Sequence, residues 1–145
     1  MTSWPPRWLT PTPEEALAVS HGKKASDFID AFAVVTKDSV GGKAGDPLRL
    51  REWQRSLLIE AFAADGDGFK HRVNLVGVPR KNGKSALASG IALWSLLTGP
   101  KGGEVYSCAA DKDQARIVFG EAKKMLESDR DLAEMAKIYR DAIEI

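Results

Sequence analysis

The sequence predicts an α/β fold in which a parallel sheet is flanked by helices. Two observations carry this prediction. An apolar run over residues 73–78 leads through Gly83-Lys84-Ser85 into residues 86–94, which have the composition of a good helix. The same order of strand, loop and helix then recurs further along the chain. Strands that alternate with helices are typical of a parallel sheet.

The loop between the first predicted strand and its helix is interpreted as a phosphate-binding loop. In such loops backbone N–H groups surround the phosphates of a nucleoside triphosphate, a lysine reaches the β- and γ-phosphates, and a serine hydroxyl holds Mg²⁺. We therefore predict that Lys84 contacts the phosphates and that Ser85 is the magnesium ligand. The candidate cofactor-binding residues of the loop are Pro79, Arg80, Lys81, Asn82, Gly83, Lys84 and Ser85.

The spacing of this loop departs from the usual pattern at one position. Val78 stands where the first glycine is expected, and Gly77 comes one residue too early. A bare Gly-Lys-Ser tripeptide is often only a surface turn. Here the apolar run before it and the helix after it supply the context that a phosphate loop requires.

Composition places few limits on function. The chain has 145 residues, which favours a single domain, and its net charge of +1 carries no global signature of nucleic-acid binding. We find no secretory leader and no long apolar span in the sequence, so an intracellular, soluble protein is expected. The one cysteine, Cys108, lies in an apolar run and is predicted to be a buried small side chain.

The first 45 residues are predicted to form an N-terminal arm with short helices. The arm is broken by prolines, and its two tryptophans, Trp4 and Trp8, are expected to pack on this domain or on a partner. Helices are predicted over residues 14–19 and 24–36. A glycine-rich joint then leads into residues 46–145, the domain that carries the phosphate loop.

A second informative segment, Pro47-Leu48-Arg49-Leu50-Arg51-Glu52-Trp53-Gln54, follows the joint and enters a helix predicted to run from Glu52 to Ala64. Taken alone, Trp53 is a core aromatic and Gln54 a surface amide. Upstream of a phosphate loop, the same pair is suited to holding adenine, because an amide can make two hydrogen bonds to the edge of the base. Trp53 and Gln54 are therefore candidate nucleotide-binding residues.

The pattern after the first helix repeats the order of strand and helix. Gly99-Pro100 is expected to end the first helix, and residues 104–110 are predicted to form a strand. Asp111 and Gln114 offer a capping box for the next helix. A further helix is predicted over residues 129–140, followed by the start of a strand at residues 142–145.

Three segments in this order resemble motifs of the large subunit of tailed-phage terminases. Residues 47–54 resemble the adenine motif of that family. Residues 78–85 resemble its variant Walker A motif, in which the first glycine is often absent and an arginine precedes Gly-Lys-Ser, and residues 106–115 are similar to the strand and helix start that follow. The resemblance implies a P-loop NTPase fold of the ASCE or RecA-like type. This chain would hold only the N-terminal part of it, with residues 46–145 as a partial ATPase domain.

The resemblance also implies a function, cofactors and partners. Terminase large subunits are the motors that package double-stranded DNA into proheads, with ATP and Mg²⁺ as cofactors. DNA, a portal protein and a small terminase subunit are the implied partners, and the host cytoplasm is the implied location. Arg80 would sense or stabilise the γ-phosphate by the same resemblance; a solvated loop arginine or a contact to a phosphate backbone is the alternative. Lys84 and Arg80 are thus the candidate catalytic residues.

The chain contains no convincing Walker B strand, the element that in this family ends in paired carboxylates and precedes a coupling motif and a nuclease domain. Residues 57–60 and 117–121 place apolar residues before an acid, but both segments are predicted to be helical. Hydrolysis of a triphosphate also needs a group that orients the attacking water. We therefore expect weak or no ATP binding and negligible turnover unless a second polypeptide supplies the missing part.

Two alternative functions remain open at this point. The chain could be a non-catalytic interaction module, or a truncated remnant, that binds a capsid, portal or small-terminase partner. A different phosphate-loop ATPase, such as a helicase, has less support from the motifs because it would need a Walker B strand as well.

Overall fold

The computed structural model describes residues 20–38 and 42–145. The predicted tryptophan arm and the predicted helix at residues 14–19 lie outside these described residues. The described chain falls into two compact units. One unit holds residues 20–27 and 50–76, and the other holds residues 28–49 and 77–145, of which 39–41 are not described. The predicted domain boundary near residue 45 stays a prediction.

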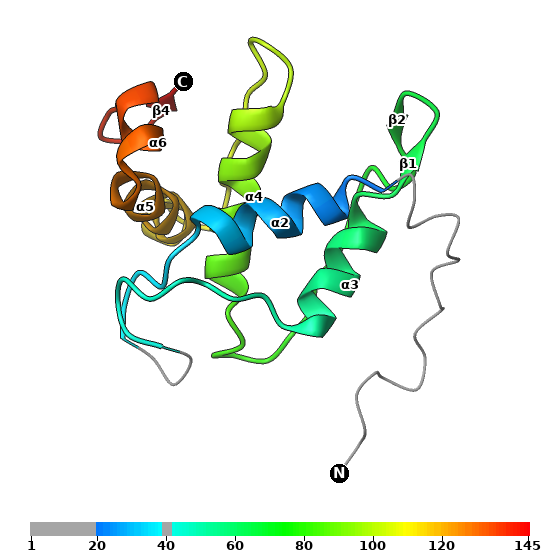
Figure 1. Ribbon diagram of the computed structural model, residues 1–145, viewed down its shortest axis with the longest axis horizontal. Helices are drawn as coiled ribbons and strands as arrows, with labels where there is room; N and C mark the ends of the chain where they lie inside the picture. Colours follow the sequence, from blue (N-terminus) through cyan, green and yellow to red (C-terminus); the bar gives the residue numbers. More distant parts are fainter. Residues whose placement is uncertain (1–19, 39–41) are drawn as a thin grey trace. The chain divides into compact units, whose positions relative to one another are not determined.

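The first unit joins the beginning of helix α2 (Gly22–Phe32) to helix α3 (Glu52–Ala61), both labelled in Figure 1. Gly22 permits backbone contact between the two helices, because a Cβ atom added there would lie 2.2 Å from the carbonyl oxygen of Leu58. The hydroxyl of Ser20 donates to the carbonyl of Ile59 at 2.6 Å. These contacts fix the start of α2 against the end of α3.

A short hairpin follows α3, which ends at Ala61 rather than at the predicted Ala64. Strand β1 (Ala64–Asp65) pairs antiparallel with β2 (Gly68–Phe69), and Gly66 and Asp67 form the turn between them. The ring of Phe69 contacts the rings of His21 and Phe62, with centroid distances of 5.8 and 5.7 Å. Aromatic packing therefore holds the hairpin on the two helices of this unit.

The second unit is built around two helices that pack on each other, α4 (Lys84–Thr98) and α5 (Lys112–Ser128) (Figure 1). Ser89 is fully buried between them, with its hydroxyl 2.8 Å from the carbonyl oxygen of Ser85 and 2.9 Å from that of Val118. This hydroxyl ties α4 to α5. The apolar core of α4 and α5 consists of Leu87, Leu93, Trp94, Ala122, Met125 and Leu126.

The second half of α2 packs against α4 through a glycine. A Cβ atom added at Gly90 would lie 2.9 Å from Cγ1 of Ile29, whose side chain is fully buried. Phe28 and Phe32 stack along α2 with ring centroids 5.1 Å apart, as their spacing predicts. The helix is shorter than the predicted range 24–36, because the chain leaves it to form the isolated bridge between Val34 and Pro47.

The C-terminal part of the second unit is only partly as predicted. Asp129 caps α6 (Arg130–Met135) by accepting a hydrogen bond from the N–H of Leu132 at 3.0 Å. The prediction of a helix through Arg140 is wrong beyond Met135, because strand β3 (Lys137–Ile138) pairs antiparallel there with β4 (Ile143–Glu144). The predicted strand start at 142–145 is confirmed by β4.

The predicted parallel sheet does not form within the described residues, which contain two antiparallel sheets of two strands each. Residues 73–78 and 104–110 have no regular secondary structure. A strand completes its hydrogen bonds only with a neighbouring strand, so an apolar run without one cannot become a strand. Leu75 is consequently 98% exposed and Tyr106 75% exposed. The prediction that Cys108 is buried is wrong for the same reason, since its side chain is exposed.

The helices themselves confirm the α part of the predicted fold, and the Asp111 cap is confirmed by a 2.8 Å hydrogen bond from the N–H of Gln114. Across residues 20–38 and 42–145, every helix falls short of the length and hydropathy that a membrane span requires.

Candidate phosphate-binding site

The loop that precedes α4 bends at two residues in the left-handed region of backbone space. Gly83, the residue just before the helix, has φ 73°, and Lys81 has φ 66°. A left-handed conformation costs a non-glycine residue about 1–2 kcal/mol, so the turn is held by its surroundings. Val78 is not one of the residues with positive φ. The missing first glycine is therefore no obstacle to this bend, which lies closer to the helix.

Hydrogen bonds within the loop compensate for this conformation. The side-chain amide of Asn82 donates to the carbonyl oxygens of Pro79 and Arg80, each at 3.3 Å. The ammonium of Lys84 donates to the carbonyl oxygen of Val78 and, at 3.1 Å, to that of Pro79. These contacts join the two ends of the loop and place the lysine against its inner edge.

The first N–H groups of α4 place positive partial charge beside the Lys84 ammonium. The first backbone bond of the helix runs from the N–H of Leu87 to the carbonyl of Gly83 at 2.9 Å. The N–H groups of Lys84, Ser85 and Ala86 precede that bond and have no partner one turn back in the helix. They carry the positive end of the helix dipole, which favours phosphate groups. With the lysine ammonium beside them, the site fits a polyphosphate.

The two remaining polar candidates of the loop differ in exposure. Arg80 is exposed, so its guanidinium is accessible to a ligand from solvent, and Ser85 is half-buried at the first turn of α4. The described residues contain no cluster of three His, Cys, Asp or Glu that could hold a metal ion. Mg²⁺ bound with a nucleotide needs few protein ligands, because phosphates and water complete its shell. A single serine ligand is compatible with that role.

Trp53 and Gln54, the other predicted nucleotide contacts, belong to the first unit. Gln54 is only 7% exposed, so the alternative that it is a surface amide is wrong. Its Oε1 accepts the N–H of Arg51 at 2.8 Å, and its own N–H donates to the Arg51 carbonyl at 2.9 Å. Gln54 thus closes the first turn of α3. A glutamine at the third helical position is one half of a capping box and could have predicted this role. The other half is usually serine or threonine, and here arginine stands at the cap position.

The two acidic segments that imitate a Walker B strand lie on helices, as predicted. Glu60 is on α3 and lies 3.2 Å from Nε2 of His71. Glu121 is on α5, is 8% exposed, and pairs with the ammonium of Lys37 at 3.3 Å. Neither carboxylate follows a strand, which is where a water-orienting acid of a parallel sheet would lie.

Titration shifts in the described residues lie outside the phosphate loop. A hydrogen bond from Arg116 is the main reason that the pKa of Asp141 is below its ordinary value. A hydrogen bond to Glu104 raises the pKa of Tyr106 above its ordinary value. Neither group belongs to the phosphate loop, residues 78–85.

A loop of this geometry at the start of a helix, with a second helix on the same core, is compatible with a nucleotide-binding class of protein. Comparison with known families is more specific. Residues 52–145 match the family described as terminase large subunit, ATPase domain. The chain therefore belongs to the terminase large-subunit family, as its three motifs indicated.

Two matches to phage HK97 agree with this family assignment. The terminase large subunit of Enterobacteria phage HK97 is 30% identical over 125 residues, which are 83% of this chain and 23% of that protein. The crystal structure of the HK97 bacteriophage large terminase matches 84% of this chain with a TM-score of 0.65 and 28% identity, and the match covers 24% of that structure's chain. This chain thus spans about a quarter of the length of both relatives.

Proposed function

We propose that this chain is the ATP-binding part of a phage terminase large subunit, the motor that packages double-stranded DNA into proheads. The observation that carries the proposal is the position of Lys84, which begins α4 and holds its ammonium against the inner edge of the loop. Membership of the terminase family supports the same function. ATP and Mg²⁺ are the proposed cofactors.

The geometry of the loop supports one role for each of its polar residues in this proposal. Lys84 exchanges its two carbonyl contacts for oxygens of the β- and γ-phosphates, while backbone N–H groups from Arg80 to Lys84 surround the phosphates. Ser85 holds the Mg²⁺ ion, which supplies charge neutralisation at the phosphates when it is bound. Arg80 stabilises charge on the γ-phosphate from the exposed side of the loop.

Adenine recognition is assigned to Trp53 and Gln54 in this proposal. The Arg51 N–H occupies one lone pair of the Gln54 carbonyl oxygen. A side-chain amide carries two acceptor sites and two donors, and the proposal assigns the second acceptor site and the NH₂ group to the base edge. The same bond fixes which way the amide points.

The remaining parts of the proposal concern the completed motor. Residues 73–78 and 104–110 become strands of an ASCE-type parallel sheet when further strands are supplied. A carboxylate that orients water comes from the same source, so this chain alone hydrolyses ATP negligibly. Double-stranded DNA, a portal and a small terminase subunit are the partners, and the host cytoplasm is the place of action.

Thermal unfolding with and without nucleotide tests the proposal. Ligand at about ten times its Kd stabilises a protein by about 1.4 kcal/mol, or roughly 3–5 °C for a chain of this size. We expect millimolar MgATP to raise Tm by a shift of this order and Lys84→Ala to abolish the rise. Lys101→Ala, which removes an exposed lysine beyond the far end of α4, is the matched control and keeps it.

Two outcomes of the Tm experiment would contradict the proposal in different ways. An unchanged Tm for the wild type at millimolar MgATP contradicts nucleotide binding by the chain alone. A rise that survives in Lys84→Ala places the nucleotide elsewhere. Phosphate release after addition of the remaining part of a large subunit then tests turnover, and continued inactivity with both parts bound favours the interaction module.

A further inference from the structure

Ser89 is a fully buried polar residue in the second turn of α4, and the phosphate site proposed above does not use its side chain. Its hydroxyl oxygen lies 2.8 Å from the carbonyl oxygen of Ser85 on the same helix and 2.9 Å from that of Val118 on α5. Both carbonyls can only accept a hydrogen bond, and a serine hydroxyl has one proton to donate. The O–H group therefore bonds to one carbonyl at a time or divides a weaker bond between the two.

The carbonyl of Ser85 is covalently linked to the start of α4. It belongs to the same peptide group as the N–H of Ala86, which precedes the first backbone bond of the helix, from Leu87 to Gly83. A hydrogen bond to a peptide oxygen polarises the peptide group and makes its N–H a stronger donor. Donation from Ser89 to Ser85 thus strengthens one of the N–H groups that carry the positive end of the α4 dipole.

The second acceptor, the carbonyl of Val118, lies within α5. Each of the two carbonyls also accepts the N–H four residues later in its own helix, so neither loses its backbone bond when Ser89 bonds to the other. The two arrangements of the O–H group are therefore close in energy. A small change at the start of α4 is sufficient to shift the balance between them.

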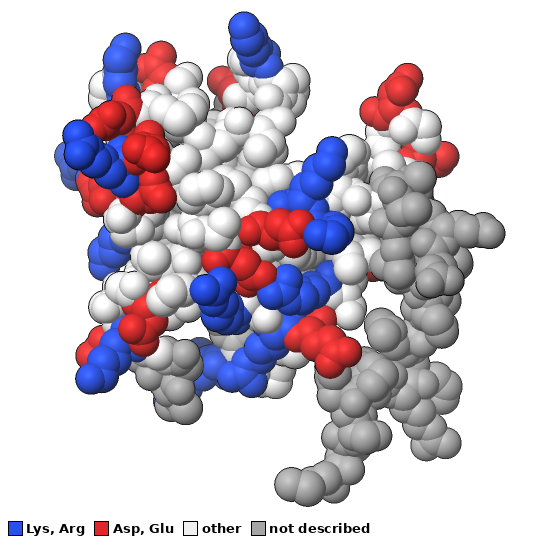
Figure 2. All heavy atoms as spheres, in the orientation of Figure 1, with Lys and Arg blue, Asp and Glu red and all other residues white. Residues whose placement is uncertain are grey.

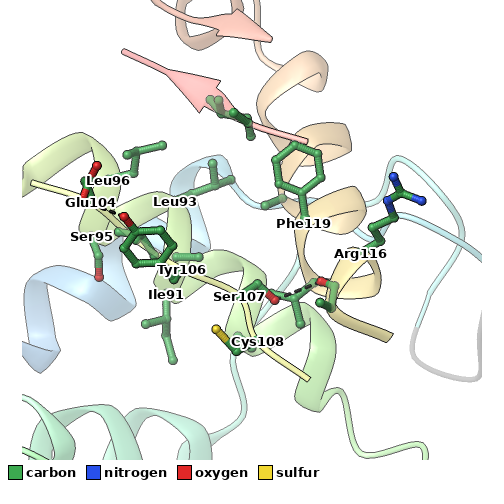
Figure 3. Close-up of a pocket in the computed structure, with 18 of the residues that line it drawn as sticks. Ile91, Leu93, Ser95, Leu96, Glu104, Tyr106, Ser107, Cys108, Arg116 and Phe119 are labelled. Atoms are coloured by element: carbon green, nitrogen blue, oxygen red, sulfur yellow. Dashed lines mark hydrogen bonds between the residues drawn. The ribbon is translucent and has the colours of Figure 1, made fainter. Parts of the chain in front are cut away.

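Hydroxyls of Thr98 and Ser107 also bond to helix carbonyls, but each has a single acceptor among the described residues. Thr98 donates to the Trp94 carbonyl at 2.7 Å within α4, and Ser107 donates to the Ala115 carbonyl of α5 at 2.9 Å (Figure 3). Ser89 differs from both because two acceptors on different helices lie within reach of its one proton.

The composition of α4 limits the other polar links to α5. Helix α4 carries no charged residue after Lys84, so no ion pair can join the rest of it to α5. In Figure 2 the upper part of α4 is correspondingly white, while acidic and basic side chains gather over α5 and α6. A change at the phosphate loop must therefore reach α5 through packing or through a neutral hydrogen bond such as that of Ser89.

We propose that Ser89 is a positioning residue of the phosphate site, with its O–H group shared between Ser85 and Val118 in the empty site and bonded to Ser85 when phosphate is bound. Phosphate at the N–H of Ala86 favours donation to the oxygen of the same peptide group, because the two bonds strengthen each other. The bond to Val118 weakens in return. This inference rests on the proposed function and adds to it a route by which nucleotide binding alters the contact between α4 and α5.

Carbonyl ¹³C resonances test the sharing without nucleotide. A hydrogen bond moves the resonance of the accepting carbonyl carbon downfield, so Ser89→Ala should move the resonances of both Ser85 and Val118 upfield. Thr98→Ala is the matched control, because it removes a hydroxyl from the same helix and should move the carbonyl resonance of Trp94 but neither of those two. Movement at only one of the two carbonyls in Ser89→Ala, or at neither, overturns the proposal.

Titration with MgATP tests the coupling. In the wild type the carbonyl resonance of Ser85 should move downfield, and that of Val118 upfield, as the site fills. Ser89→Ala should raise the Kd for MgATP about two- to fivefold, because polarisation changes a neighbouring bond by only part of its strength. Thr98→Ala should leave the Kd unchanged. Ser89→Cys nearly preserves the volume but donates weakly, so it should resemble Ser89→Ala. A wild-type Kd in Ser89→Cys would assign the loss in Ser89→Ala to packing and overturn the proposal.

Failure of the coupling and failure of the proposed function give different results. A wild-type Kd for MgATP in Ser89→Ala, or a Val118 resonance that stays in place as the wild-type site fills, overturns the coupling and leaves nucleotide binding intact. A wild-type chain that binds no MgATP contradicts the proposed function, and the coupling that rests on it fails with it. The comparison of ¹³C resonances without nucleotide measures the sharing in either case.

Discussion

One unit contains two apolar helices, α4 and α5, and an apolar segment, residues 104–110. The helices form regular structure with buried side chains, whereas the segment has neither. Each helix bonds its backbone internally, so it needs neighbours only for its side chains. Ser89, fully buried, and Leu126, with no exposed surface, show that these side chains have found them. The segment has the composition of a strand, but its backbone bonds must come from another strand. Val105 and Tyr106 therefore stay 43% and 75% exposed.

This difference shows which parts of this fold can form from local contacts. The phosphate loop needs only its own carbonyls, Asn82 and the start of α4 to take its shape. The sheet that normally lies beside such a loop needs strands that are distant in sequence. The loop thus takes its shape in a structure whose described residues contain no parallel sheet.

The largest expected effect is in the helical core. Leu126→Ala removes a fully buried side chain of α5 and should lower the free energy of unfolding by about 2–5 kcal/mol, because it leaves a cavity. Val105→Ala, in the segment, should change it by less than about 0.5 kcal/mol. Urea unfolding followed by circular dichroism measures both. Equal losses would mean that the segment is packed as firmly as the helices.

Two helical glycines, Gly90 on α4 and Gly120 on α5, differ in how closely they are packed. At Gly90 a Cβ atom meets Ile29 at 2.9 Å, and at Gly120 nothing lies within 4 Å. Gly90→Ala should cost about 1–3 kcal/mol through overpacking. Gly120→Ala should stabilise the protein by about 0.5–1 kcal/mol, since alanine is the better helix former. Unfolding midpoints that move in the same direction would contradict the close packing of α2 on α4.

A smaller effect is expected at the start of α5. Asp111→Ala removes the acceptor for the Gln114 N–H and should cost about 1 kcal/mol, the usual value of an N-cap. Asp113→Ala, in the first turn of the same helix, removes a charge but no cap and should cost less. Thermal unfolding of the two variants distinguishes them; a larger loss at Asp113 would assign the stabilisation to the helix dipole instead.

The smallest effect concerns the contact between α5 and the β3–β4 hairpin. Arg116 donates to Asp141 at 2.8 and 3.1 Å, which lowers the pKa of Asp141. Because the folded-state pKa is below the unfolded one, the contact contributes fully above about pH 4, the ordinary aspartate value. The contribution is lost as the pH falls through the lowered pKa.

Amide exchange in β3 and β4 measures this dependence. The hairpin should open on acidification below that value in the wild type, whereas Asp141→Asn should make it open to a similar extent at every pH. A hairpin whose exchange in the wild type shows no acid dependence would exclude Asp141 as its anchor. Because the pair is exposed, the effect on overall unfolding should be near the limit of detection.

The sequence alone predicted most of the helical segments, the loop before α4 and the family. The apolar periodicity placed α3, α4 and α5, the Asp111 cap was readable from its spacing, and Gly83-Lys84-Ser85 marked the loop and its family. Each of these features depends on contacts within a few residues of itself. Local sequence is sufficient to specify them.

Only the tertiary structure decided whether the apolar runs form strands and which side chains are buried. Residues 73–78 and 104–110 have strand composition, but pairing is a long-range property that no local pattern contains. The burial of Gln54 and its bond to Arg51, the exposure of Cys108, and the end of α6 at Met135 depend likewise on which neighbours are present. A helix carries its hydrogen bonds within itself and a strand does not, which is why the sequence predicted the former and left the latter to the fold.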